Sequence, residues 1–238
     1  MPNKADWITA RPIAHRGLHD ISAGRPENSL SAAAAAIANG FAIEVDLQPS
    51  SDGVPMVFHD YTLERMTGEK GNVRDWKADE LHRLALSNTA DHIPTLVELL
   101  DAVSGKTGLV LELKGLAGQD DGFVVAVTQT LASYAGPVAI MSFNHWLLAD
   151  ARDEAPRLTL GLTAEGDDSH FGEHVAALRA YDPDFVSYGI GDLPCRFVAE
   201  FRQTGRPVIT WTVRSPADAV KSARYADQIT FEGFDPRR

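Results

Sequence analysis

The stretch FAIEVDL, residues 41–47, is a short apolar run that carries two acidic residues one position apart. Its length and its apolar residues on both faces favour a β-strand buried on both sides, which is typical of parallel sheets covered by helices. A helical pattern, NSLSAAAAAIANG at 28–40, precedes it directly, with Asn28 or Ser29 at its start and Gly40 at its end. The stretch therefore predicts one unit of an alternating α/β fold.

The same alternation continues along the chain, because seven further apolar runs predict strands and helical patterns lie between them. These runs are RPIAH (11–15), GLVLELK (108–114), PVAIMSF (137–143), RLTLGLT (157–163), DFVSYG (184–189), PVITWTV (207–213) and DQITFEG (227–233). The later helical patterns cover 95–105, 122–136, 145–156, 170–181, 194–205 and 215–226. Together they predict an α/β fold, a (β/α)₈ TIM barrel. The chain stops soon after the last run, which predicts a missing or reduced eighth helix, with the segment before Arg11 partly covering that flank.

The segment 60–92, after the second predicted strand, is too long for an ordinary barrel loop. It contains a helical pattern of its own, ADELHRLAL at 78–86. We expect an insertion over the mouth of the barrel. Residues 1–238 as a whole are expected to form one TIM-barrel catalytic domain, because single α/β barrels reach this length.

The composition limits the partners and the compartment. The 22 basic and 33 acidic residues give a formal charge of −11, which argues against nucleic acid as a partner. The single cysteine, Cys195, excludes an internal disulfide and favours a reduced, cytoplasmic location. The first residues lack the apolar run of a signal peptide, and no stretch approaches the ~18 apolar residues of a membrane span. We expect no membrane span, and self-association is left open.

Acidic residues lie near the ends of two predicted strands, where barrels of this class carry their catalytic groups. Glu44 and Asp46 share one strand face, and Glu112 and Lys114 share another. Three carboxylates that converge would repel one another unless a cation joins them. All-oxygen ligation suits Mg²⁺ or Ca²⁺, with Mn²⁺ as a third candidate. An ion pair between Glu112 and Lys114 is the structural alternative.

Two histidines follow apolar runs in the same part of the predicted barrel. His15 ends the first run, and His59 follows the hairpin signal SSDGV. If Asp52 and Gly53 are the two loop residues, Asp46 lies opposite His59, although a bulge could shift this register by one. Two imidazoles beside a metal and basic residues are suited to phosphoryl chemistry, with proton transfer by the histidines.

Blocks of the chain resemble the glycerophosphodiester phosphodiesterases, in the same order and over nearly the whole length. The blocks are HRG (15–17), PENS (26–29), EVDL (44–47), DG (52–53), HD (59–60), IPTLVELL (93–100), LELK (111–114), SF (142–143) and WTV (211–213). The resemblance implies a TIM barrel of the phosphatidylinositol-phospholipase-like type. It implies metal-dependent hydrolysis of a small-molecule glycerophosphodiester to glycerol 3-phosphate and an alcohol.

The resemblance also implies roles for single residues. It implies that His15 and His59 are the acid/base pair and that one divalent cation is bound by three acids, Glu44, Asp46 and Glu112. It implies that the phosphate pocket is lined by Arg16, Glu27 and Lys114. Trp211 is either core packing or a lining for the glycerol. The segment 60–92 is similar to the insertion that covers the substrate in this family.

Two positions depart from the family's pattern, and two other functions stay open. Arg214 follows WTV where family members often have Asn, and Phe231 stands in the last run where Thr-Asp or Thr-Asn is common. A phospholipase D-like barrel acting on lysolipids would need an apolar mouth, for which Phe231 and the insertion are the candidates. A catalytically silent phosphodiester-binding barrel is less favoured, because every acid and histidine of the pattern is present.

The other histidines are weaker candidates. His82 and His92 lie in the predicted insertion. His170 and His174 have an i, i+4 helix spacing that could bind a metal but more often marks an exposed helix face.

Overall fold

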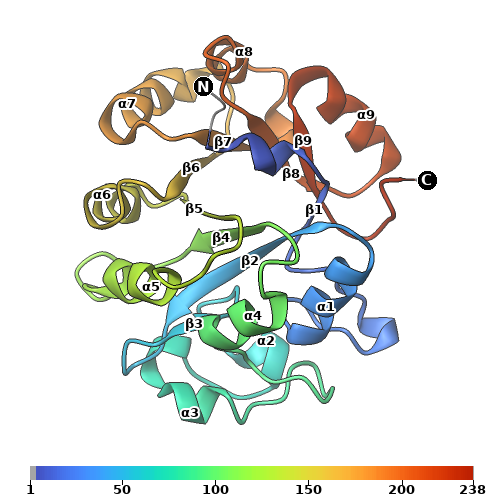
Figure 1. Ribbon diagram of the computed structural model, residues 1–238, viewed down its shortest axis with the longest axis vertical. Helices are drawn as coiled ribbons and strands as arrows, with labels where there is room; N and C mark the ends of the chain where they lie inside the picture. The colour runs from blue at the N-terminus through green and yellow to red at the C-terminus, as the bar shows by residue number, and fades with distance from the viewer. Residues whose placement is uncertain (1–3, 238) are drawn as a thin grey trace.

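Eight parallel strands close into a barrel, because β1 (Ile13–Ala14) pairs with both β2 and β9 (Figure 1). The computed structural model describes residues 4–237. Around the barrel the other strands are β2 (Ala42–Pro49), β4 (Leu109–Leu113), β5 (Val138–Ser142), β6 (Thr159–Ala164), β7 (Phe185–Gly189), β8 (Val208–Val213) and β9 (Gln228–Phe231). Every predicted strand is present, and the TIM barrel is confirmed.

Helices surround these strands (Figure 1). They are α1 (Leu30–Ala38), α4 (Leu96–Val103), α5 (Phe123–Leu131), α6 (His145–Glu154), α7 (Phe171–Tyr181), α8 (Arg196–Arg202) and α9 (Pro216–Tyr225). Short 3-10 helices lie at Ile21–Ala23, Asp168–His170 and Ile190–Asp192. The prediction was a missing or reduced eighth helix, and within the described residues no helix follows β9. Within residues 4–237 no helix has the length and apolar character needed to cross a bilayer.

The hairpin after β2 differs from the predicted register by one residue. The returning strand is β3 (Pro55–Val57), and the N–H of Phe58 donates to the carbonyl of Asp46 at 3.0 Å. The expected pairing of Asp46 with His59 is therefore wrong. The loop holds three residues instead of two, and Gly53 takes a left-handed φ of +80°, which is the usual geometry of a three-residue hairpin loop.

The segment before β1 closes the amino-terminal end of the barrel, instead of the flank where it was expected. Its 3-10 helix, η1 (Asp6–Thr9), inserts Ile8 among apolar side chains that point into the barrel, such as Phe185 and Ile209. The carbonyl of Thr9 accepts a hydrogen bond from the side chain of Gln228 at 2.9 Å. The opposite, carboxyl end of the strands is thereby left as the open one.

The segment before β1, here called the amino-terminal plug, packs closely against the barrel, and this packing predicts a stability effect at Gly108. A Cβ at Gly108 would lie 2.3 Å from the ring of Trp7, so Gly108→Ala forces the plug to move. We expect a loss of roughly 1–3 kcal/mol in the free energy of unfolding, measured in urea. Gly172→Ala is the matched control, because no atom lies within 4 Å of its added Cβ and alanine favours the helix. Wild-type stability of Gly108→Ala would contradict the packing of Trp7.

The chain between β3 and α4 forms a small core of its own. It contains α2 (Glu64–Thr67), a 3-10 helix at Val73–Asp75 and α3 (Ala78–Leu81). Its buried side chains are Met56, Phe58, Leu63, Met66, Val73, Leu81, Leu86 and Ile93. The helix predicted at 78–86 ends at Leu81, because the chain turns there and brings Leu86 into the same small core.

Candidate active site

The polar side chains at the carboxyl ends of the strands converge on one cavity of about 180 Å³. It is lined by His15, Arg16, Glu44, Asp46, His59, Glu112, Lys114, Met141, Phe143, Trp211, Thr212, Arg214 and Thr230. The structure thus brings together every predicted site residue except Glu27. The hydroxyl of Thr230 is buried at this cavity without a hydrogen-bond partner.

Three carboxylates form the acidic part of the cavity. Asp46 on β2 and Glu112 on β4 are directly paired in the sheet, and Glu44 lies two residues before Asp46 on the same face. One oxygen of each lies within 4.8 Å of the others, and their residues are only 2%, 2% and 8% exposed. Unscreened acids this close are costly unless positive charge joins them.

Burial and the repulsion between the carboxylates raise the pKa values of the two glutamates. Burial and the charges of Asp46 and Glu112 raise the pKa of Glu44 well above its usual value. Burial beside Asp46 raises the pKa of Glu112 to about 7. The three carboxylates offer only oxygen ligands, and their combined negative charge needs a positive partner. They therefore fit a divalent cation of the Mg²⁺ or Ca²⁺ type.

Two basic side chains face the carboxylates from the rim. Lys114 Nζ lies 3.3 Å from Asp46 Oδ1 and 3.4 Å from Glu112 Oε1, so the predicted alternative of an ion pair with Glu112 is also present. Arg16 Nε lies 3.4 Å from Asp46 Oδ2. Burial acts to raise the pKa of Asp46, but the charges of Lys114 and His59 outweigh it and lower that pKa.

The backbone of the His-Arg-Gly turn positions Arg16. Arg16 itself has a left-handed φ of +54°, and its N–H donates to Glu44 Oε2 at 2.9 Å. Gly17 follows with φ +78°, and a Cβ there would lie 2.8 Å from that of Ala32 on α1. Only glycine fits this close approach. Arg16 Nε is buried and makes no hydrogen bond, although it lies 3.4 Å from Asp46 Oδ2.

Asn28 is a site residue that the sequence predicted only as a helix cap. Ser29 caps α1, since its side chain accepts from Ala32 N–H. Asn28 instead donates to Asp46 Oδ2 at 2.9 Å and accepts from the Asp46 N–H at 3.2 Å. It therefore fixes the orientation of the Asp46 carboxylate.

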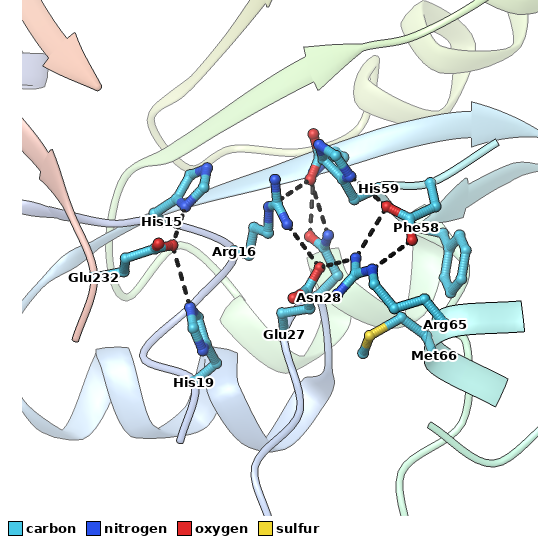
Figure 2. A network of polar contacts seen from close by, with 12 residues as sticks. His15, Arg16, His19, Glu27, Asn28, Phe58, His59, Arg65, Met66 and Glu232 are labelled. Carbon is cyan, nitrogen blue, oxygen red and sulfur yellow. Dashed lines mark hydrogen bonds and ion pairs between the residues drawn. The ribbon is translucent and has the colours of Figure 1, made fainter. Parts of the chain in front are cut away.

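His15 is held by a residue that the sequence analysis did not identify. Glu232 directly follows β9, and its Oε2 lies 2.5 Å from His15 Nδ1 (Figure 2). The same carboxylate is 3.5 Å from His19 Nε2, and its Oε1 accepts from Arg214 Nε at 2.6 Å. The other ring nitrogen of His15, Nε2, lies 3.9 Å from Glu44 Oε2.

Glu232 keeps its negative charge because of these partners. Burial acts to raise the pKa of Glu232, but the hydrogen bond with His15 and the nearby ring of His19 outweigh it and lower the pKa strongly. The only hint of Glu232 in the sequence was that the last apolar run, ITFEG, departs from the family's usual Thr-Asp or Thr-Asn. Phe231 is buried against Phe41 at a centroid distance of 4.8 Å and does not line the cavity. Phe231 thus supplies no apolar mouth.

His59 approaches from the opposite side of Arg16, as Figure 2 shows. Its Nδ1 lies 2.7 Å from Asp60 Oδ1. Gln48 on β2 holds this turn, because its side-chain amide donates to the carbonyls of Phe58 and Asp60 at 2.9 and 2.7 Å. Burial lowers the pKa of His59, although the charge of Asp46 opposes this shift.

Glu27 and Arg65 form a layer behind the cavity. Glu27 accepts from Arg16 Nη1 at 2.8 Å and from Arg65 Nη2 at 2.7 Å, so it orients Arg16 and does not line the cavity. Arg65, on α2, also donates to Asp60 Oδ2 at 2.5 Å. It thereby links Asp60, next to His59, to Glu27, which in turn holds Arg16 next to His15. No sequence motif had indicated Arg65.

An aromatic pair forms one wall of the cavity. Trp211 on β8 donates through Nε1 to the carbonyl of Ser187 at 3.3 Å. Its ring meets that of Phe143 edge-on at a centroid distance of 5.3 Å. Of the two readings for Trp211, the structure supports a cavity lining.

The fold and the site together define an α/β barrel with an acidic, cation-flanked pocket at the carboxyl ends of its strands. The chain belongs to the glycerophosphoryl diester phosphodiesterase family, whose model matches residues 15–231. It is 33% identical over 162 residues to the glycerophosphodiester phosphodiesterase of Caldanaerobacter subterraneus, and the matched region covers 63% of this chain and 65% of that protein. It is 34% identical over 123 residues to human glycerophosphodiester phosphodiesterase 1, and the matched region covers 47% of this chain and 35% of that protein. The chain thus spans less than two thirds of each of these relatives.

Among solved structures the fold is similar to that of a phosphodiesterase from Oleispira antarctica, which was solved in complex with the product sn-glycerol-3-phosphate. The two share 27% sequence identity with a TM-score of 0.85, over 97% of this chain and 96% of that one.

Proposed function

We propose that the protein hydrolyses glycerophosphodiesters to glycerol 3-phosphate and a free alcohol, in the cytoplasm. One observation carries the proposal: a single small cavity combines three buried carboxylates, two histidines and the basic residues Arg16, Lys114 and Arg214. Positive groups of this kind suit a phosphate, and imidazoles suit proton transfer to and from its ester oxygens. The product bound in the Oleispira antarctica relative is of the same class.

We infer that Glu44, Asp46 and Glu112 hold one divalent cation, Mg²⁺ or Ca²⁺, with Mn²⁺ as a third candidate. When bound, such an ion supplies positive charge to the phosphate oxygens. Arg16 and Lys114 bind the remaining phosphate oxygens, and Glu27 holds Arg16 in place through the 2.8 Å contact. Trp211 and Phe143 form a wall for the organic part of the substrate.

His15 and His59 act as the acid/base pair. One removes the proton from the attacking oxygen, and the other donates a proton to the leaving alcohol. Glu232 and Asp60 orient the two rings through the Nδ1 atoms, which leaves each Nε2 to act on the substrate; His15 Nε2 lies 3.9 Å from Glu44 Oε2. The segment 60–92 covers the mouth in this proposal, and Arg65 is the residue that connects it to the site.

The attacking oxygen is either the glycerol 2-hydroxyl, through a cyclic phosphate, or water. A substrate without the 2-hydroxyl separates these routes. Undiminished turnover of that substrate excludes the cyclic route, and loss of turnover supports it.

The substrate class is tested with glycerophosphocholine, glycerophosphoethanolamine and a long-chain lysophospholipid in one assay. We expect glycerol 3-phosphate from the first two, because a cavity of about 180 Å³ is small for an acyl chain. Preference for the lysophospholipid would favour the phospholipase D-like alternative. Binding of the diesters without turnover, with Mg²⁺, Ca²⁺ and Mn²⁺ each supplied, would favour the silent barrel.

Glu232→Gln tests the positioning of His15. We expect kcat to fall by about 10-fold or more with KM little changed, because the carboxylate holds a ring that acts in the transition state. Glu200→Gln is the matched control, since this exposed glutamate pairs with Arg196 on α8, away from the cavity. Circular dichroism of both variants checks folding. Wild-type kcat in Glu232→Gln would remove it from the mechanism.

A further inference from the structure

A second cluster of metal-ligating side chains lies outside the barrel. His82 directly follows α3, His92 lies in the loop before α4, and Glu98 is in the first turn of α4. One potential ligand atom from each lies within 4.8 Å of the other two. None of the three lines the cavity described above, so the proposed function leaves them unused.

We propose that His82, His92 and Glu98 bind a transition-metal ion of the Zn²⁺ class, and that this ion fastens the small core after β3 to α4. His82 Nδ1 lies 3.5 Å from Glu98 Oε2, and His92 Nε2 lies 3.3 Å from Glu98 Oε1. Both contacts are long for N–H···O hydrogen bonds, whose usual length is about 2.9 Å. Ligands placed tetrahedrally at roughly 2.0–2.1 Å from Zn²⁺ stand about 3.3–3.4 Å apart. The Glu98 carboxylate faces each histidine at about this spacing, His82 through Oε2 and His92 through Oε1.

The donor set selects the class of ion. Imidazole nitrogens favour Zn²⁺ and its transition-metal neighbours over Mg²⁺ and Ca²⁺, which favour oxygen. The two rings lie with centroids 3.7 Å apart. A metal ion binds imidazoles in the neutral form, so it can hold two rings that lie this close together. The three side chains are 32–42% exposed, which leaves room for water to complete the coordination.

The Glu98 side chain and the backbone next to the two histidines are held in place without an ion. Glu98 Oε2 accepts from the N–H and the hydroxyl of Thr95 at 2.9 and 3.0 Å, in the capping box of α4. Such partners orient a ligating carboxylate. Leu81 and Ile93, the neighbours of the two histidines, are fully buried in the small core. The ion would therefore connect that core, which carries Arg65, to the barrel.

Zinc binding to the full-length protein tests the proposal, with a chromophoric chelator as competitor. The barrel carboxylates are first removed as ligands by the double substitution Glu44→Gln, Glu112→Gln. We expect one equivalent of Zn²⁺ to bind in this background and to raise Tm. His92→Ala and His82→Ala should each weaken that binding by at least about 10-fold. His170→Ala, an exposed histidine outside the cluster, should leave it unchanged.

Two further measurements separate the cluster from general histidine binding and from the barrel site. Co²⁺ in place of Zn²⁺ should give visible absorption bands that His92→Ala abolishes and His170→Ala keeps. In the otherwise wild-type chain, His92→Ala should keep the Mg²⁺-supported hydrolysis of glycerophosphocholine. The proposal would be overturned if the Glu44→Gln, Glu112→Gln protein bound no zinc. It would also be overturned if adding His92→Ala or His92→Asn to that protein left its zinc affinity unchanged.

Discussion

Replacing His59 with asparagine is expected to slow hydrolysis of glycerophosphocholine by about 100-fold or more, the usual contribution of a positioned acid or base. The amide can still donate to Asp60, whose carboxylate lies 2.7 Å from the replaced Nδ1, so the surrounding turn should keep its structure. The substitution removes the Nε2 side of the ring, which is the side available to the substrate. Steady-state kinetics should show the loss mainly in kcat.

The same loss is expected for His15→Ala. His170→Asn is the matched control for both, because this exposed histidine contacts Asp167 near α7 and does not line the cavity. Thermal unfolding distinguishes a catalytic defect from unfolding. Full activity of either the His15 or the His59 variant would remove that histidine from the mechanism.

Removal of divalent ions with EDTA is expected to abolish turnover, and Glu112→Gln should do so even with excess Mg²⁺. Glu112 lies 8% exposed beside Asp46, and without its charge the three-carboxylate site loses a ligand. Activity should return to the EDTA-treated wild type, but not to the variant, when metal is added back. Turnover that survives EDTA and Glu112→Gln together would contradict metal-dependent hydrolysis.

Replacing one of the three carboxylates is expected to lower activity but to raise the stability of the metal-free protein. Burial and its acidic neighbours raise the pKa of Glu44, so between the unfolded and the folded pKa the folded chain holds a proton that the unfolded chain has released. This destabilisation begins above the unfolded pKa of roughly 4.3 and grows as pH rises toward the folded pKa. Glu44→Gln removes it, and we expect a higher Tm, by roughly 2–4 °C for each kcal/mol gained. Differential scanning calorimetry at pH 5 and pH 8 checks the sign, because the gain should be larger at pH 8.

Local patterns were sufficient for the strands, the helices and the main acids. A strand buried on both faces has a short apolar run, and residues two apart on it share a side, so Glu44 and Asp46 could be placed together from the chain alone. Conversely, the hairpin register was wrong by one because a two-residue and a three-residue loop fit the same Asp-Gly signal.

The contacts that orient the proposed catalytic groups depend on the closed barrel. Glu232 lies 217 residues from His15 in the chain, and only the pairing of β1 with β9 brings them to 2.5 Å. Arg65 reaches Glu27 across 38 residues through the packing of the small core. The sequence by itself determined the strands and helices of the barrel and placed the acids on shared strand faces, because those follow from short-range periodicity. The two histidines were indicated instead by their position after apolar runs and by the resemblance to the family. The partners that hold them were decided by tertiary structure, because contacts between distant segments leave no local pattern.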